Sequence, residues 1–89
     1  MEYEWDDTKN QTNIKKHGFP FTVAPYVLET EYYLDRSDRN GEERWIAVGP
    51  FDGRLVAVVF TRRDDKYRII SIRRARYDEE TAYRSLYEQ

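Results

Sequence analysis

The stretch that decides the fold is residues 42–63, EERWIAVGPFDGRLVAVVFTRR. Two runs of strand-like composition, EERWIAVGPF and RLVAVVFTRR, flank the dipeptide Asp52-Gly53. Asp-Gly between extended runs is typical of a two-residue β-hairpin turn, because both central residues of that turn need a positive φ. The stretch therefore predicts two antiparallel strands joined by a tight turn.

The same pattern continues on both sides of this hairpin. Upstream, EYYLDRSD at residues 31–38 is joined to it through Asn40-Gly41. Downstream, KYRIISIRRAR at residues 66–76 follows a turn at Asp64-Asp65. The four runs together predict an antiparallel meander.

Strand alternation assigns the side chains of the last two runs to faces of the sheet. Thr61 and Arg63 share one face, and so do Ser71 and Arg73. The isoleucines at positions 70 and 72 are then expected to point the other way, into the core.

Three helices and a short strand are predicted outside the meander. Residues 2–5 form a strand candidate, and a helix capped by Asp6 or Asp7 runs to about His17, where Gly18 closes it in the left-handed conformation. Thr22 is the expected cap of a second helix to about Glu29. Asp78 is the expected cap of a last helix, DEETAYRSLYEQ. The order strand, helix, helix, four strands, helix predicts an α+β fold in a single domain, residues 1–89, with an antiparallel sheet of four to five strands, two N-terminal helices and one C-terminal helix.

The first helix has almost no apolar stripe. Within DDTKNQTNIKKH, Ile14 is the only large apolar residue. Such a helix either lies loosely on the surface or offers its polar side chains to another group.

Composition excludes several classes of site. The chain has no cysteine and one histidine, so disulfides, thiolate metal sites and H-E-x-x-H zinc sites are excluded. Phosphate-binding and nucleophile-elbow glycine motifs are absent as well, so we expect any catalysis to use no metal and no cofactor. The longest apolar run, LVAVVF, is too short to cross a membrane, and the acidic N-terminus lacks the features of a signal peptide. A cytoplasmic protein without membrane contact is expected.

Charge is segregated along the chain. Residues 44–76 hold nine Lys and Arg against three Asp, whereas both flanking segments are acidic. This distribution favours a positive face for an anionic partner, and the alternative is a solvated sheet face with neighbouring compensation. Arg73, Arg74 and Arg76 cluster at one strand end, where their forked donors suit phosphate. Any one of them could instead pair with Glu79, Glu80 or the Asp64-Asp65 turn.

His17 in NIKKHG, residues 13–18, has two interpretations. Its ordinary pKa near neutrality suits a general acid or base. Basic residues in a last helical turn followed by glycine are, however, also an ordinary helix end.

Three separated motifs resemble the BrnT family of toxins from type II toxin–antitoxin systems. The first motif is EWDDTKNQTNIKKHGFPF, with Trp5, Asp6, Lys9, Asn13, Lys16, His17, Gly18 and Phe21 at the expected positions. The second is EERWIAVG. The third is VVFTRRDDKYRIISIRRA, with Thr61, Arg63, Arg68, Ile69, Ile70, Ser71, Arg73 and Ala75. Small departures from the family pattern are Arg62, the glycine-free turn Asp64-Asp65, and Ile72.

The resemblance implies a fold similar to RelE-type ribonucleases and a ribonuclease activity that arrests translation and growth. It implies an RNA substrate and a BrnA-like antitoxin, which alone would contact operator DNA. For metal-independent cleavage by the 2′-hydroxyl we expect Arg73 and Arg63 to stabilise the phosphorane, His17 to act as acid or base, and Lys16 to orient phosphate or transfer the proton. The residues expected to bind substrate are Arg74, Arg76, Arg62 and Arg44. A catalytically inactive module that binds RNA or a partner protein is the alternative, and a homodimer through the aromatic last helix is a weaker one.

Overall fold

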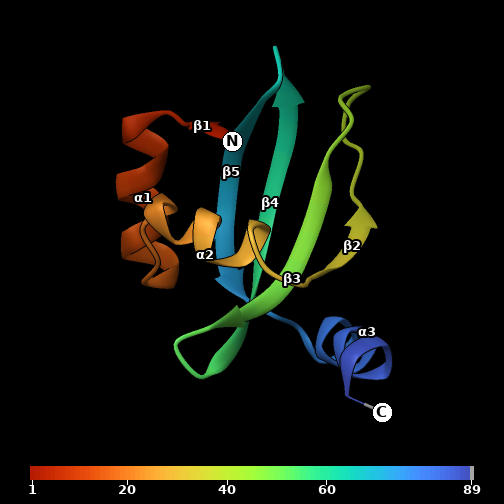
Figure 1. The fold of residues 1–89 in the computed structure, drawn as a ribbon. Helices are drawn as coiled ribbons and strands as arrows, with labels where there is room; N and C mark the ends of the chain where they lie inside the picture. Colours follow the sequence, from red (N-terminus) through yellow and green to blue (C-terminus); the bar gives the residue numbers. More distant parts are fainter. Residues whose placement is uncertain (89) are drawn as a thin grey trace.

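The computed structural model describes residues 1–88 and contains the predicted order of elements (Figure 1). The elements are β1 (Glu2–Glu4), α1 (Asp7–His17), the 3₁₀ turn η1 (Phe21–Val23), α2 (Ala24–Leu28), β2 (Tyr33–Arg36), β3 (Trp45–Phe51), β4 (Arg54–Arg63), β5 (Lys66–Arg74) and α3 (Tyr77–Tyr87). The α+β class is therefore correct. Over the described part of the chain, none of the helices has the length and apolar character needed to span a membrane.

The central meander forms as the turn dipeptides predict. β2, β3, β4 and β5 are consecutive antiparallel neighbours in the sheet. Asp52 and Gly53 have φ of 53° and 81°, and Asn40 and Gly41 have φ of 51° and 79°. Both dipeptides thus adopt the left-handed conformations of a hairpin turn, because Asn, Asp and Gly tolerate positive φ.

The sheet is mixed, so the expectation of an antiparallel sheet is wrong at one edge. The strand order is β1-β5-β4-β3-β2, and β1 runs parallel to β5, with Glu2 opposite Lys66 and Glu4 opposite Arg68. The direction of β1 follows from the position of α1. This helix begins shortly after β1 ends and lies along the same edge of β5 (Figure 1). A three-residue strand has no turn signal of its own, so only its tertiary neighbours set its direction.

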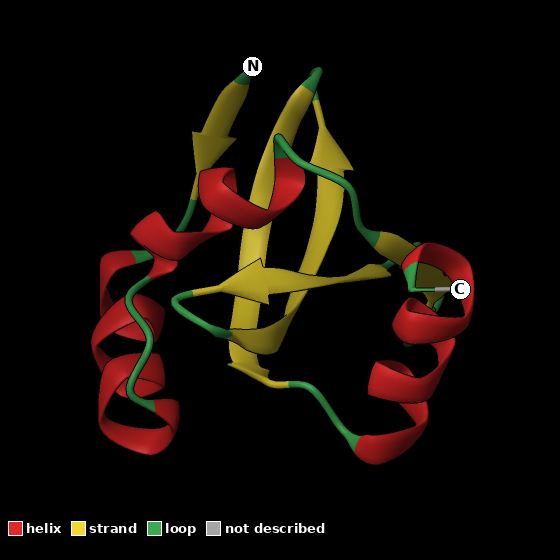
Figure 2. Cartoon of the chain, turned by 60° about the horizontal axis from the view of Figure 1, so that its bottom comes forward, coloured by secondary structure: helices red, strands yellow, loops and turns green. Residues whose placement is uncertain are grey.

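Each face of the sheet is packed by different helices. On one face η1 and α2 cover strand residues that include Val58, Ile69 and Ile72. α2 approaches β3 closely at Gly49, where a Cβ would lie 3.1 Å from Val27 Cγ1. On the other face α3 packs over Val48, Leu55 and Ala57 through Tyr83. Figure 2 shows α1 and α3 on opposite sides of the strands.

The alternation expected for β5 is broken by a β-bulge. Val59 pairs with Ser71 but Phe60 pairs with Ile69, which leaves Ile70 as the extra residue. A bulge shifts the alternation by one position. Ile69 and Ile72 are therefore both buried in the core, whereas Ile70 is only half-buried, so its expected place in the core is wrong.

The ends of α1 are as predicted. The Asp6 carboxylate accepts a hydrogen bond from the Lys9 backbone N–H at 3.0 Å, which caps the first turn. Gly18 closes the helix with φ of 82°, and its N–H donates to the Ile14 carbonyl.

The predicted caps of the other two helices are wrong. Thr22 lies inside η1, because the chain enters α2 through a 3₁₀ turn that follows Pro20. α3 begins one residue before Asp78, at Tyr77, with Arg76 as its cap. The Glu79 carboxylate accepts from the Arg76 backbone N–H at 2.8 Å, and this contact fixes the start of α3.

Candidate active site

α1 is attached to the sheet through one buried polar side chain. Asn13 is 6% exposed, its Nδ2 donates to the Ile72 carbonyl at 2.9 Å, and its Oδ1 accepts from the Ile72 N–H at 3.1 Å. The amide thus pairs with β5 as the peptide group of a neighbouring strand would. Nδ2 also donates to the Phe19 carbonyl at 2.8 Å, which holds the connector after α1. Because both the nitrogen and the oxygen of the Asn13 amide are hydrogen-bonded, they fix the position of α1 along β5.

A groove of about 220 Å³ lies between α1 and β5. We call it the α1–β5 groove, and it is lined by Lys9, Thr12, Asn13, Lys16, His17, Ile70 and Ser71. Three of these side chains carry or can accept a positive charge, and none is a carboxylate. Across residues 1–88, no cluster of three or more His, Cys, Asp and Glu side chains is arranged to hold a metal ion. The donor set of the groove suits an anion such as phosphate.

The environment of His17 favours its neutral form. Burial lowers the pKa of the imidazole, and the positive charges of Lys16 and Arg73 lower it further. His17 is therefore close enough to Arg73 for the charge of the guanidinium to act on the imidazole. A histidine with a pKa below its ordinary value is uncharged at neutral pH and can accept a proton there.

Arg73 is held by a carboxylate. Its Nη1 and Nη2 donate to Glu79 Oε1 and Oε2 at 2.8 and 2.9 Å, and the two side chains are 14% and 11% exposed. Burial raises the pKa of Glu79, but hydrogen bonds from Arg73 and the Arg76 N–H outweigh burial, so the pKa is lowered overall. For Arg73 the structural alternative considered from sequence, pairing with Glu79, is the observed arrangement. The positive charge of Arg73 lowers the pKa of His17, while two of the guanidinium nitrogens donate to Glu79.

Arg63 does not lie beside Arg73. Arg73 is opposite Ala57 in the sheet, and Arg63 is opposite Lys66 at the hairpin end. The six residue steps along β4 from Ala57 to Arg63 span roughly 20 Å at about 3.3 Å per residue. The two arginines therefore cannot stabilise one phosphorane together.

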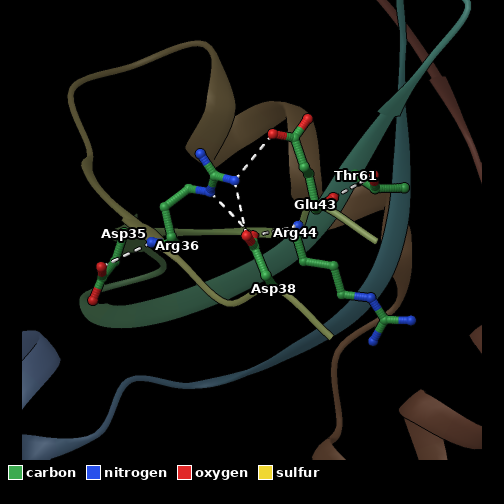
Figure 3. A network of polar contacts seen from close by, with 6 residues as sticks. All are labelled: Asp35, Arg36, Asp38, Glu43, Arg44 and Thr61. Atoms are coloured by element: carbon green, nitrogen blue, oxygen red, sulfur yellow. Dashed lines mark hydrogen bonds and ion pairs between the residues drawn. The ribbon is translucent and has the colours of Figure 1, made fainter. Parts of the chain in front are cut away.

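The four expected substrate-binding arginines are spread over the molecule. Arg62 stacks on the ring of Tyr67 at 4.7 Å, on the α2 side of the sheet. Arg44 Nε donates to Glu42 at 2.7 Å, and in Figure 3 its guanidinium points away from the Arg36–Asp38–Glu43 network that holds its backbone N–H. The other two, Arg74 and Arg76, are exposed. The charge of Arg76 acts on the Glu79 carboxylate at the start of α3.

Comparison with known proteins identifies the family. The model of the BrnT family, described as the ribonuclease toxin of a type II toxin–antitoxin system, matches residues 5–79. The chain belongs to the BrnT family. The crystal structure of the Brucella abortus ribonuclease toxin BrnT, at 1.1 Å resolution, is similar at 31% sequence identity and a TM-score of 0.65, over 85% of this chain and 97% of that one. No curated protein matches the chain.

In this BrnT-family chain the groove contains three polar residues that the sequence did not single out as site residues. Lys9, Thr12 and Ser71 line it together with Lys16 and His17. A signal for the helical part was present, because positions 9, 12, 13, 16 and 17 form one stripe at helical spacing. A polar stripe on a helix without an apolar one indicates that the polar side faces the protein. Ser71 stands in the family motif and shares a strand face with Arg73, but neither signal placed it beside α1.

Proposed function

We propose that this chain is a metal-independent endoribonuclease toxin that cleaves RNA in the α1–β5 groove. The observation that carries the proposal is the placement of His17 in a groove that contains Lys9 and Lys16 and no carboxylate. Burial and the charges of Lys16 and Arg73 lower the pKa of its imidazole, which favours the neutral form. A cationic groove binds the phosphate, and a neutral imidazole beside it can accept the proton of a nucleophile.

In the proposed reaction the 2′-oxygen forms a bond to phosphorus while the bond to the 5′-oxygen breaks. His17 takes the proton of the 2′-hydroxyl, and the Lys16 ammonium gives a proton to the leaving 5′-oxygen. Lys9 and the charge of Arg73 stabilise the extra negative charge on the phosphorane. The products are a 2′,3′-cyclic phosphate and a free 5′-hydroxyl.

The other arginines are assigned to binding rather than chemistry. Arg63 lies too far along β4 for the reacting phosphate, so it contacts a phosphate further along the strand. Arg74 and Arg76 are exposed beyond Arg73 and contact the backbone near the groove. Arg62 and Arg44 already have partners in Tyr67 and Glu42, so we expect smaller contributions from them.

Metal independence is tested with purified protein and single-stranded RNA in EDTA. We expect cleavage in EDTA and 2′,3′-cyclic phosphate ends, because the groove offers no carboxylate for a divalent cation. Cleavage that EDTA abolishes and Mg²⁺ restores would overturn the mechanism.

The role of His17 is tested with matched variants of the last turn of α1. His17→Gln should fold normally and reduce cleavage about 10²- to 10⁴-fold, the usual contribution of a general base. Lys15→Gln is the control, because Lys15 lies in the same turn, is exposed and does not line the groove. RNA binding should remain in both variants. A wild-type protein that binds RNA and cleaves none would favour the alternative function, a non-catalytic RNA-binding module.

We also propose that a BrnA-like antitoxin neutralises the chain and that free toxin stops translation and growth in the cytoplasm. The proposal rests on membership of a toxin–antitoxin family. Co-expression with the neighbouring open reading frame should give a stable complex without ribonuclease activity and restore growth. A complex with full activity would contradict neutralisation by covering the groove. The antitoxin, rather than this chain, would bind operator DNA, and size measurements on the free toxin test for a homodimer.

A further inference from the structure

An open hollow lies beside the loop that follows His17. Its volume is about 440 Å³, and its walls are Tyr26 from α2, Pro50 and Phe51 from the end of β3, and Asp52 from the β3–β4 turn. In Figure 1 this turn points toward the lower end of α1, and in Figure 2 it points toward the loop that follows this helix. The hollow is thus separate from the α1–β5 groove but close to the end of the helix that forms it.

A row of three aromatic rings runs from the hollow to the connector that follows α1. The Phe19 and Phe51 ring centroids are 6.5 Å apart, and those of Phe51 and Tyr26 are 5.6 Å apart. Phe19 is tied to the groove, because its carbonyl accepts from Asn13 Nδ2. Tyr26 ends the row and is 66% exposed, so most of its surface is available to a ligand.

The polar groups of the hollow differ from those of the groove. Asp52 is exposed, and no hydrogen bond or ion pair holds its carboxylate within residues 1–88. Its backbone is fixed in the left-handed conformation of the turn, with φ of 53°. A carboxylate repels phosphate but accepts hydrogen bonds from the amino groups of bases, while exposed aromatic rings stack on base faces.

We propose that Tyr26, Phe51 and Asp52 form a nucleobase subsite, which stacks one base of the RNA strand held in the α1–β5 groove and selects a base with an amino group. The inference rests on the proposed function and adds sequence preference to it. The distribution of charge supports this occupant. Lys9, Lys16 and His17 lie where the phosphate is expected, whereas the residues that line the hollow include the carboxylate of Asp52 and no Lys, Arg or His.

The test measures the binding of 2′-O-methyl RNA hexamers by fluorescence anisotropy at low salt. These hexamers cannot be cleaved by 2′-hydroxyl attack. Tyr26→Ala should weaken binding by about 5- to 100-fold, the range for the loss of one stacked base, whereas Tyr26→Phe should bind as wild type. Tyr77→Ala is the matched control, because Tyr77 is 85% exposed on α3, away from the hollow. Wild-type protein should prefer hexamers whose central base carries an amino group over all-uracil hexamers. Asp52→Gly should remove that preference, because glycine lacks the acceptor and keeps the positive φ of the turn.

Three results would overturn the subsite. The first is Tyr26→Ala binding the hexamers as tightly as Tyr77→Ala does. The second is an unchanged base preference in Asp52→Gly. The third is a Tyr26→Ala protein that loses affinity for a co-expressed antitoxin and keeps its affinity for RNA, which would make the hollow a protein-docking site. In all three cases loss of cleavage in His17→Gln would leave the ribonuclease proposal standing, while a wild type that neither binds nor cleaves RNA would overturn both.

Discussion

Replacing Asn13 by alanine should weaken the attachment of α1 to the sheet and lower the free energy of unfolding. The change removes four hydrogen bonds: two with the Ile72 backbone, one to the Phe19 carbonyl and a longer one from the Ser71 hydroxyl. It leaves the Ile72 N–H, the Ile72 carbonyl and the Phe19 carbonyl without this partner. The site is buried, since Asn13 itself is only 6% exposed. A hydrogen bond contributes about 1 kcal/mol net, and an unpaired buried group costs about 1–3 kcal/mol, so the expected loss is roughly 2–4 kcal/mol. This is a large part of the ~5–15 kcal/mol of a small domain.

The measurement is equilibrium unfolding in urea, followed by circular dichroism, with the free energy extrapolated to water. Gln11→Ala is the control, because Gln11 lies on the exposed side of the same helix and should change stability by less than about 0.5 kcal/mol. Asn13→Asp keeps the shape and the acceptor for the Ile72 N–H, but it places oxygen against the Ile72 and Phe19 carbonyls. We expect it to be at least as unstable as Asn13→Ala at neutral pH. An Asn13→Ala protein as stable as Gln11→Ala would refute the reasoning.

The remaining predictions concern protonation, substrate binding and a turn. Because His17 is the chain's one histidine, its NMR titration is unambiguous: its pKa should lie below 6.5 and rise in Arg73→Gln. The unfolded chain then binds this proton more tightly, so stability should fall as pH drops from above 6.5 through the folded pKa, and His17→Gln should lack this component. Arg63→Ala should raise KM and flatten the salt dependence of binding while kcat stays unchanged, and an equal loss of kcat would place Arg63 in the chemistry. Asp65 has φ of 65°, so Asp65→Gly should stabilise the protein by about 0.5–1 kcal/mol in urea unfolding, whereas Gly53→Ala should destabilise it.

Short-range chemistry determined most of the fold. Asn40-Gly41 and Asp52-Gly53 specify hairpin turns through their own φ preferences, so the meander could be predicted from residues adjacent in the chain. The same holds for α1, where Asp6 and Gly18 set both ends through local hydrogen bonds. The predicted helix caps at Thr22 and Asp78 were wrong. At these positions a 3₁₀ turn and a hydrogen bond from the Arg76 backbone to Glu79 replace the usual cap.

The candidate site was predicted only in part. The basic helix end with Lys16 and His17 was visible in the sequence, and the groove contains both residues. The grouping of Arg63 with Arg73 failed, because strand register, not residue type, decides which arginines lie near one another. Whether an arginine is free or held also depends on a distant partner, as the pairing of Arg73 with Glu79 shows.

The sequence by itself determined the elements, their order and the charge of the central block. Only the tertiary structure decided that β1 is parallel to β5, that the bulge at Ile70 turns Ile69 and Ile72 to one face, and that Asn13 binds Ile72. Asn13 and Ile72 are 59 positions apart, so no local preference could reveal their contact. A turn forms because of the φ preferences of two adjacent residues. The pairing of a buried amide with a strand edge forms only when the rest of the fold leaves the backbone groups of that edge without another partner.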